Sequence, residues 1–300
     1  MKKTLLSPHK LSENGASILL AAVIIARATS LLFAKYCLDV MQPFTLLAVR
    51  SITALLFLIP LFRNNLRNIT RYEILGGSFI GLFMFLMMAA ELVSLQRTES
   101  SIISIIENTA IVFVPIVQAI ISRRFPHKNA LICCSITMVG IFLLLYEGGQ
   151  FRISYGETMS LLAALSYTFA IISTAKISRK GDAINIGIIQ VAVMAIFALA
   201  ISLFVEGFTL PSTANTWFYL LYLALVCTGF GFTLQPLAQS RCSSEKAGLF
   251  CALSPLTSVL LGVIVLGEAF FLRDVVGFVL ILGSVIVYTL FENRTLSKYS

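Results

Sequence analysis

Long apolar runs separated by short polar connectors dominate the pattern of this sequence. Ten runs reach or approach the length that a helix needs to cross a hydrocarbon core of about 30 Å. Connectors of four or five residues, at 39–42 and 96–100, leave sequential helices antiparallel. We therefore predict an all-α integral membrane protein with ten transmembrane helices, at residues 16–38, 43–62, 74–95, 101–122, 129–146, 157–175, 184–205, 216–237, 246–266 and 271–291.

Two pairs of similar segments indicate that the chain is a repeat. LLAAVIIARATSLLFAK from Leu19 matches LLAALSYTFAIISTAK from Leu161, at an offset of 142 residues. ALSPLTSVLLGVIVLGEAF at 252–270 matches the more divergent SIIENTAIVFVPIVQAIISRR at 104–124, at an offset of 146. The second alignment places Ser122 opposite Glu268.

Each half contains five predicted helices, and an odd number makes the second half enter the membrane from the opposite side. The sequence therefore predicts two inverted five-helix repeats, an architecture that recurs in secondary transporters. We expect the repeats at 16–146 and 157–291, joined by the loop 147–155, with short tails at 1–15 and 292–300.

Composition and charge agree with a membrane protein. Hydrophobic residues make up 58% of the chain and charged residues 12%, too little polar surface for a soluble globule. If the N-terminus is cytoplasmic, sixteen of the 22 Lys and Arg residues lie in cytoplasmic segments, three lie outside, and three lie within helices. This bias predicts a cytoplasmic membrane protein with both termini inside, and it explains the net charge of +8 without a nucleic-acid partner.

The N-terminal segment has an alternative interpretation as a cleavable signal peptide, with lysines, an apolar stretch and Ala26-Arg27-Ala28. We favour a spanning helix, because apolar residues resume at 31–34 and cleavage would break the alternation of charge. The six cysteines lack metal-ligand or CxxC spacing. We expect them to be reduced packing residues, and we expect no metal and no cofactor.

Four charged residues lie well inside predicted helices: Arg27, Arg50, Glu91 and Glu107. A charge at mid-bilayer costs at least a few kcal/mol and rarely faces lipid. At about 1.5 Å per residue, Arg50, Glu91 and Glu107 fall in one layer, roughly 6 to 10 Å below the outer surface, and Arg27 lies deeper. The matched depths predict that these side chains meet.

Two interpretations of this layer remain open. In the first, Arg50 pairs with Glu91 or Glu107 and only fixes helix packing. In the second, part of the set faces a water-filled cavity, where arginine would suit a carboxylate or phosphate and glutamate an ammonium group or a proton. The candidate substrate-binding residues are Arg27, Arg50, Glu91, Glu107, Asn108, Tyr167 and Gln190. Pro115 and Pro255, which lie within apolar helices, are the candidate hinges.

Four motifs resemble the EamA-like branch of the drug/metabolite transporter superfamily: PFTLLAVR at 43–50, ENTAIVFVP at 107–115, GETMSLLAALSYTFA at 156–170, and ALSP with LGE within 252–268. The resemblance covers about residues 16–291. It implies a ten-helix carrier with a central cavity between two repeats, exporting or exchanging small metabolites. The family's tryptophan in the first helix is absent, and the single tryptophan, Trp217, opens the eighth predicted helix.

The sequence offers no basis for an enzyme. His9 and His127 are the only histidines, both lie outside the predicted helices, and neither an HExxH motif nor a phosphate-binding glycine loop is present. We expect a secondary transporter of a small polar or zwitterionic, amino-acid-like metabolite, with a proton or a counter-substrate as coupling partner and lipid around it. The alternative is a channel or a lipid scramblase without gradient coupling.

Overall fold

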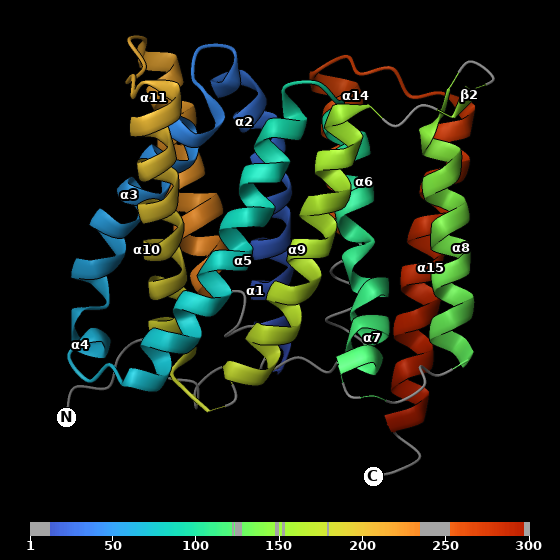
Figure 1. The fold of residues 1–300 in the computed structure, drawn as a ribbon, viewed down its shortest axis with the longest axis horizontal. Helices are drawn as coiled ribbons and strands as arrows, with labels where there is room; N and C mark the ends of the chain where they lie inside the picture. Colours follow the sequence, from blue (N-terminus) through green and yellow to red (C-terminus); the bar gives the residue numbers. More distant parts are fainter. Residues whose placement is uncertain are drawn as a thin grey trace.

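The fold was analysed in a computed structural model, which describes residues 13–121, 123, 128–147, 150–151, 154–178, 180–234 and 253–296. These residues form a bundle of helices that run roughly along one axis (Figure 1). The elements of the first half are α1 (Glu13–Ala28), α2 (Ser30–Leu38), α3 (Pro43–Leu61), α4 (Arg63–Leu66), α5 (Arg71–Leu95), α6 (Ser100–Asn108), α7 (Ala110–Ile121) and α8 (Lys128–Leu145).

The second half repeats this pattern of long helices. Its elements are α9 (Tyr155–Ile177), α10 (Ala183–Ile201), the π-helical segment η2 (Ser202–Glu206), α11 (Ala214–Tyr222), the π-helical segment η3 (Leu223–Phe230), α14 (Leu253–Val265) and α15 (Leu272–Leu296). The prediction of an all-helical membrane protein built from two inverted halves is confirmed. In the described chain, six helical stretches are long and apolar enough to cross a membrane, and two further apolar helices are shorter.

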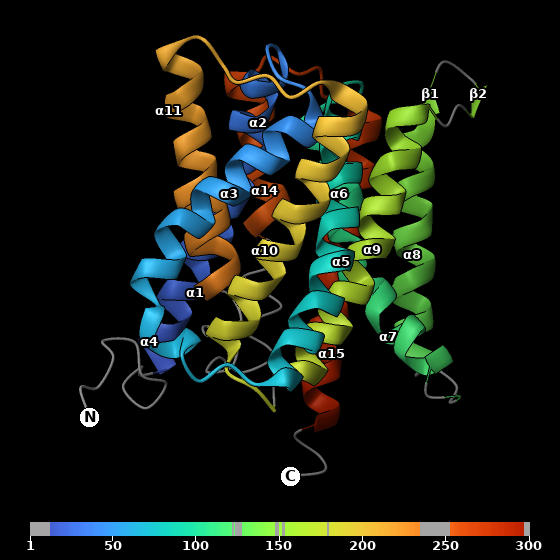
Figure 2. The same ribbon diagram turned by 60° about the vertical axis from the view of Figure 1, so that its left-hand side comes forward.

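The loop between the halves holds an element that was not predicted. Strand β1 (Tyr146–Glu147) pairs antiparallel with β2 (Gln150–Phe151). This hairpin and the α2–α3 connection lie at one face of the bundle, the hairpin face, whereas α1 begins and α15 ends at the opposite face, the terminal face (Figure 2).

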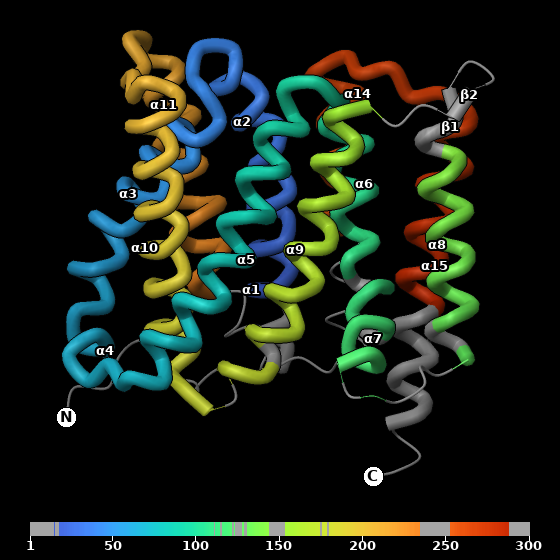
Figure 3. Tube along the Cα trace, in the orientation of Figure 1, coloured from blue at the N-terminus to red at the C-terminus, as the bar shows by residue number. Residues whose placement is uncertain are grey.

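The interior is built where the two halves meet. α5 of the first half packs along α9 and α10 of the second, and α10 also packs along α3. At one end of the bundle α8 and α15 lie side by side (Figure 3). Glycines allow the close contacts: a Cβ at Gly77 would lie 2.8 Å from Ile189 Cβ, and one at Gly81 3.0 Å from the Gln190 carbonyl oxygen.

Large apolar side chains cover the outside of the bundle, among them Phe204 at 88% exposure and Ile264 at 75%. Polar side chains lie inside, including Arg50 at 1% and Gln190 at 2%. This distribution, apolar outside and polar inside, suits a lipid environment, where the outer surface must be apolar and polar groups find partners within the protein.

Two carboxylates cap helices of the opposite half. Glu206, at the end of η2, accepts from the backbone N–H groups of Phe44 (2.9 Å) and Thr45 (2.7 Å) at the start of α3. Glu73, in the first turn of α5, accepts from the N–H of Asp182 (2.9 Å) at the start of α10. A carboxylate satisfies unpaired N–H groups and the positive end of the helix dipole. The two caps lie on opposite faces, so α3 and α10 are each fixed by the other repeat.

Candidate functional site

Two membrane helices change geometry at a threonine directly beyond a charged residue. α1 and α2 meet at Thr29, two residues after Arg27, and α6 and α7 meet at Thr109, two residues after Glu107. Each hydroxyl donates to the carbonyl three residues earlier, Ala26 at 2.7 Å and Ile106 at 2.6 Å. Such bonds compete with regular helical bonding and often bend a helix. At Thr29 the regular backbone bonds remain, whereas at Thr109 the N–H bonds to the carbonyl three residues earlier, so the helix tightens there. The two charges therefore lie just before the α1–α2 and α6–α7 junctions.

Arg27 is held by groups from the second half of the chain. Its Nη1 donates to the Tyr167 hydroxyl at 3.1 Å. The guanidinium carbon lies 4.7 Å from the centre of the Phe232 ring and 5.5 Å from that of Tyr167, within the range of cation–π attraction. A Cβ at Gly231 would come within 2.8 Å of Arg27 Cγ, so glycine gives the stem its space. Arg27 thus lies between α1, α9 and the helix that follows η3.

The carboxyl groups of Glu91 on α5 and Glu107 on α6 lie close enough to interact electrostatically, and both attract Arg27. Two neighbouring carboxylates repel each other, so a proton on one of them stabilises such a pair. Glu91 is buried, whereas Glu107 is half-buried. The pair can therefore hold a proton and present one negative charge toward Arg27.

Arg50 lies beside this cluster but is fixed by neutral groups. Its Nε donates to the Thr228 hydroxyl at 3.0 Å and its Nη2 to the Ser30 hydroxyl at 3.3 Å. Its Nη1 has no hydrogen-bond partner among the described residues, and no described carboxylate lies within ion-pair distance. Glu91 still attracts it electrostatically. Arg50 thus joins α3 to α2 and η3, and it leaves one buried donor unused.

Asn108 and Gln190 lie at the edge of the cluster. Asn108 follows Glu107, is 8% exposed, and its Nδ2 has no hydrogen-bond partner in the described chain. Gln190 Nε2 donates to the Phe232 carbonyl at 3.4 Å and thereby holds the backbone of the residue whose ring covers Arg27. Of the predicted residues, Arg27, Glu91, Glu107 and Tyr167 form the centre, and Arg50, Asn108 and Gln190 surround it.

The helix irregularities do not lie at the predicted hinge prolines. α7 runs through Pro115 and α14 through Pro255. The hinge role of both prolines stays a prediction. In α14 the side chain that reaches the site is Ser258, whose hydroxyl donates to the carbonyl of Ala28 at 3.1 Å, next to Arg27.

Sequence reasoning found Tyr167 but missed the other partners of the two arginines. Phe232 is one apolar residue among many, and Ser30 and Thr228 look like ordinary helix residues. The signal that could have located Thr228 is Thr-Gly-Phe-Gly at 228–231, since small residues in a membrane helix mark close contacts. The π-helical segment that presents Thr228 leaves no such signal.

The remaining chemistry of the described residues is sparse. No group of three or more His, Cys, Asp or Glu side chains in the described ranges could hold a metal ion. Cys37, Cys133 and Cys227 are buried and not in disulfides. Trp217 is held by a bond from its Nε1 to the Pro211 carbonyl, 2.9 Å. Gln235, a further polar residue of the eighth predicted helix, lies outside the described residues.

Comparison with known proteins supplies the family. The EamA-like transporter family matches residues 14–146 and again 154–290. An uncharacterized transporter of Archaeoglobus fulgidus is 25% identical over 260 residues, 84% of this chain and 89% of its own length. The uncharacterized transporter YetK of Bacillus subtilis is 22% identical over 289 residues, 92% of this chain and 87% of its own.

A solved structure shares the fold. It superimposes with a TM-score of 0.67 at 17% identity and covers 95% of this chain and 99% of its own length. The two family matches together span nearly the whole chain. The chain is therefore a multi-pass membrane protein that belongs to the EamA-like transporter family.

Proposed function

We propose that this transporter is a secondary carrier for a small zwitterionic metabolite, one with a carboxylate and an ammonium group. The observation that carries the proposal is the placement of Arg27 near Glu107 and Glu91, beside the α1–α2 and α6–α7 junctions. Arg27, Glu107 and Tyr167 are half-buried, although their neighbours come from several helices. Partial exposure at this depth is the behaviour of side chains that border a path for a solute.

The chemistry of the cluster matches a zwitterion. A guanidinium binds a carboxylate with parallel hydrogen bonds, and a carboxylate suits an ammonium group. The aromatic rings of Tyr167 and Phe232 restrict the rotation of Arg27. The cluster therefore offers one cationic and one anionic partner to the same solute.

The shared proton of Glu91 and Glu107 supports a proton as the coupling partner. An ammonium group that binds Glu107 competes for the same carboxylate charge, so arrival of the substrate favours release of the proton. This competition makes the two occupancies exclusive, which is the requirement for exchange. The carrier would then export or exchange its substrate in return for a proton.

The charge bias of the loops supports an orientation with the terminal face in the cytoplasm. Glu73 and Glu206 join the two halves at opposite faces, which suits rocking of one repeat against the other around a central site. In the alternative, a channel or scramblase, the same helices would form a continuous path. Saturable and stereoselective uptake into proteoliposomes separates them, because flux through a channel would not saturate at millimolar substrate.

The substrate class is tested by comparing metabolites inside and outside cells that express the wild type, R27Q, E107Q or R97Q at equal levels. Arg97 is an exposed arginine above Tyr155 at the hairpin face, so R97Q is a matched control. We expect the wild type and R97Q to redistribute a zwitterionic metabolite. Loss of a charged hydrogen-bond partner costs about 1.5 to 3 kcal/mol, so R27Q should lower the transport rate about tenfold to a hundredfold. Parental redistribution by both R27Q and E107Q would contradict the proposal.

A further inference from the structure

The connection between α14 and α15 turns back over the end of α14. Gly267 has φ +66, a left-handed conformation that favours glycine. The N–H of Glu268 donates to the Gly262 carbonyl across this turn, 3.1 Å, in the manner of a glycine C-cap. The Glu268 carboxylate lies between Gly262 of α14 and the start of α6.

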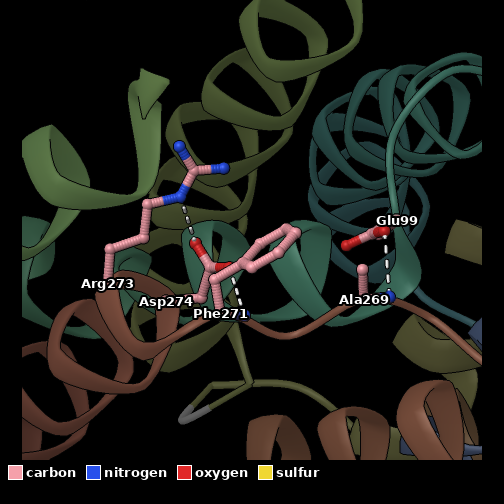
Figure 4. A network of polar contacts seen from close by, with 5 residues as sticks. All are labelled: Glu99, Ala269, Phe271, Arg273 and Asp274. Atoms are coloured by element: carbon pink, nitrogen blue, oxygen red, sulfur yellow. Dashed lines mark hydrogen bonds and ion pairs between the residues drawn. The ribbon is translucent and has the colours of Figure 1, made fainter. Parts of the chain in front are cut away.

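The carboxylate of Glu268 caps α6. Oε1 accepts from the N–H of Ser100 at 2.6 Å, and Oε2 accepts from the N–H of Ser101 at 3.0 Å and from the Ser101 hydroxyl. The side chain of Glu99, the residue that would normally cap this helix, instead accepts from the N–H of Ala269 at 3.3 Å (Figure 4). α6 and the α14–α15 connection are thus joined by two reciprocal contacts across the boundary between the repeats.

Close packing beneath the cap leaves no space between the helices. α14 packs along α6, and a Cβ at Gly262 would overlap both the Glu268 carboxylate and the Ser101 hydroxyl. Beyond the cap, Asp274 accepts from the N–H of Phe271 at 2.9 Å and pairs with Arg273 at 3.4 Å, which anchors the start of α15 (Figure 4). The hairpin face is therefore tightly closed between α6 and α14.

This contact lies on the two helices that border the proposed site. Ser101 precedes Glu107 by six residues of α6, about 9 Å along the helix. Gly262 follows Ser258 by four residues of α14, about 6 Å. Both steps lead from the site toward the hairpin face, so a solute that leaves the site on this side between α6 and α14 meets the Glu268 contact.

Symmetry distinguishes Glu268 from the other two cross-repeat caps. Glu206 and Glu73 cap corresponding helices of the two repeats, α3 at the hairpin face and α10 at the terminal face. In the sequence alignment of the repeats Glu268 lies opposite Ser122, an uncharged residue that lies outside the described part of the chain. In an inverted repeat, the two access states exchange the roles of the halves. A carboxylate in one repeat and an uncharged residue in the other therefore make the two halves unequal at this position of the sequence.

From these contacts of Glu268 with α6 we propose that Glu268 is the positioning residue that closes the hairpin face of the transport path, so that α6 must release its carboxylate when the site opens to that face. The proposal rests on alternating access, as proposed above. It predicts that the unloaded protein prefers the state that is closed at the hairpin face, and that neutralising Glu268 shifts this preference without altering Arg27, Glu91 or Glu107.

The test measures the gate directly, in purified protein in lipid nanodiscs without substrate. Spin labels at Q96C and L272C, two exposed positions on either side of the contact, report their separation by double electron–electron resonance, in a background with the native cysteines replaced. Variants are E268Q and G262A, which adds a methyl group where Glu268 and Ser101 meet. The matched control is E206Q, which neutralises an equivalent cap on α3.

We expect a predominantly short separation in the wild type and in E206Q. E268Q should raise the ratio of long to short separations about fivefold to tenfold, from the loss of a charge at a partly buried helix N-terminus. G262A, which retains the carboxylate, should shift the distribution in the same direction. Wild-type distributions in both E268Q and G262A, or an equal shift in E206Q, would overturn the proposal. Because no substrate is present, these outcomes are independent of the R27Q transport result.

Discussion

Replacing Thr228 by valine removes one hydroxyl from the interior while keeping the shape of the side chain. The hydroxyl accepts from Arg50 Nε at 3.0 Å, and Arg50 is 1% exposed. Nη1 already has no hydrogen-bond partner among the described residues, so T228V leaves the guanidinium with the 3.3 Å bond to Ser30 as its remaining described hydrogen bond. A hydrogen bond to a charged group contributes about 1.5 to 3 kcal/mol.

We therefore expect T228V to destabilise the protein by about 2 kcal/mol. With an unfolding entropy of about 2.1 cal/mol/K per residue, this corresponds to a fall in Tm of about 3 °C for a chain of 300 residues. The effect should depend on the charge of Arg50. In an R50M background the charge is absent, and T228V should cost less than about 0.5 kcal/mol.

The assay is a double-mutant cycle on purified protein in one detergent, read as the midpoint of thermal unfolding for the wild type, T228V, R50M and R50M/T228V. A coupling energy of about 2 kcal/mol supports Arg50 as a residue fixed by neutral hydroxyls. A parallel cycle with E91Q tests the ion-pair interpretation. Additive effects of R50M and T228V, together with strong coupling between R50M and E91Q, would refute the reasoning.

Three further predictions follow from particular contacts. E206Q should lower stability by about 1 kcal/mol in the same thermal assay, because its carboxylate caps α3, and an unchanged midpoint would contradict the cap. Y167F should raise the apparent KM for the identified substrate about threefold or more with little change in kcat, because the hydroxyl holds Arg27; a selective fall in kcat would contradict this role. Burial, and then the Glu268 carboxylate, raises the pKa of Glu99. The closed gate therefore favours protonated Glu99. Lowering the pH through that pKa should increase the fraction of molecules with the short spin-label separation; a similar pH response in E99Q would contradict the assignment.

Other groups besides Glu268 also influence the pKa of Glu99. Asp274 also raises the pKa of Glu99, whereas Lys35 and the N–H of Ala269 lower it. Together these effects raise the pKa of Glu99 above its ordinary value. The ionised carboxylate therefore destabilises the closed gate at high pH, and protonation at low pH removes this destabilisation. E99Q is uncharged at every pH and removes this contribution.

The arrangement along the membrane axis could be predicted from the sequence. Apolar length located the helices, and repeat offsets located the two halves. Counting residues from a helix end gives the depth of a side chain, which brought Glu91 and Glu107 into one layer. The structure places these two in contact, and Arg27, which was expected to lie deeper, beside them.

The arrangement around each helix axis could not be predicted. Depth does not specify rotation, and a π-helical segment such as η3 changes the direction of each side chain that follows it. For this reason the bond between Arg50 and Thr228 was not foreseen. The irregularity at Thr109 was missed too. A proline in the sequence indicates a possible break in a helix, whereas a threonine that bonds to its own helix does not.

The cap on α6 was hidden for a different reason. Glu268 was recognised as an acid at a helix end, but its partner Ser101 is 167 residues away in the sequence. A single sequence, read without an alignment, contains no signal that two such positions are in contact. The turn at Gly267 is visible only as a glycine after an apolar run.

The central claim is that Arg27 binds the carboxylate of the transported metabolite. Once the metabolite is identified by its redistribution, its Kd is measured on purified protein by isothermal titration calorimetry for the wild type, R27Q and the exposed control R97Q. The account predicts an unchanged Kd for R97Q and a Kd about tenfold to a hundredfold higher for R27Q. A Kd for R27Q equal to that of the wild type would contradict it.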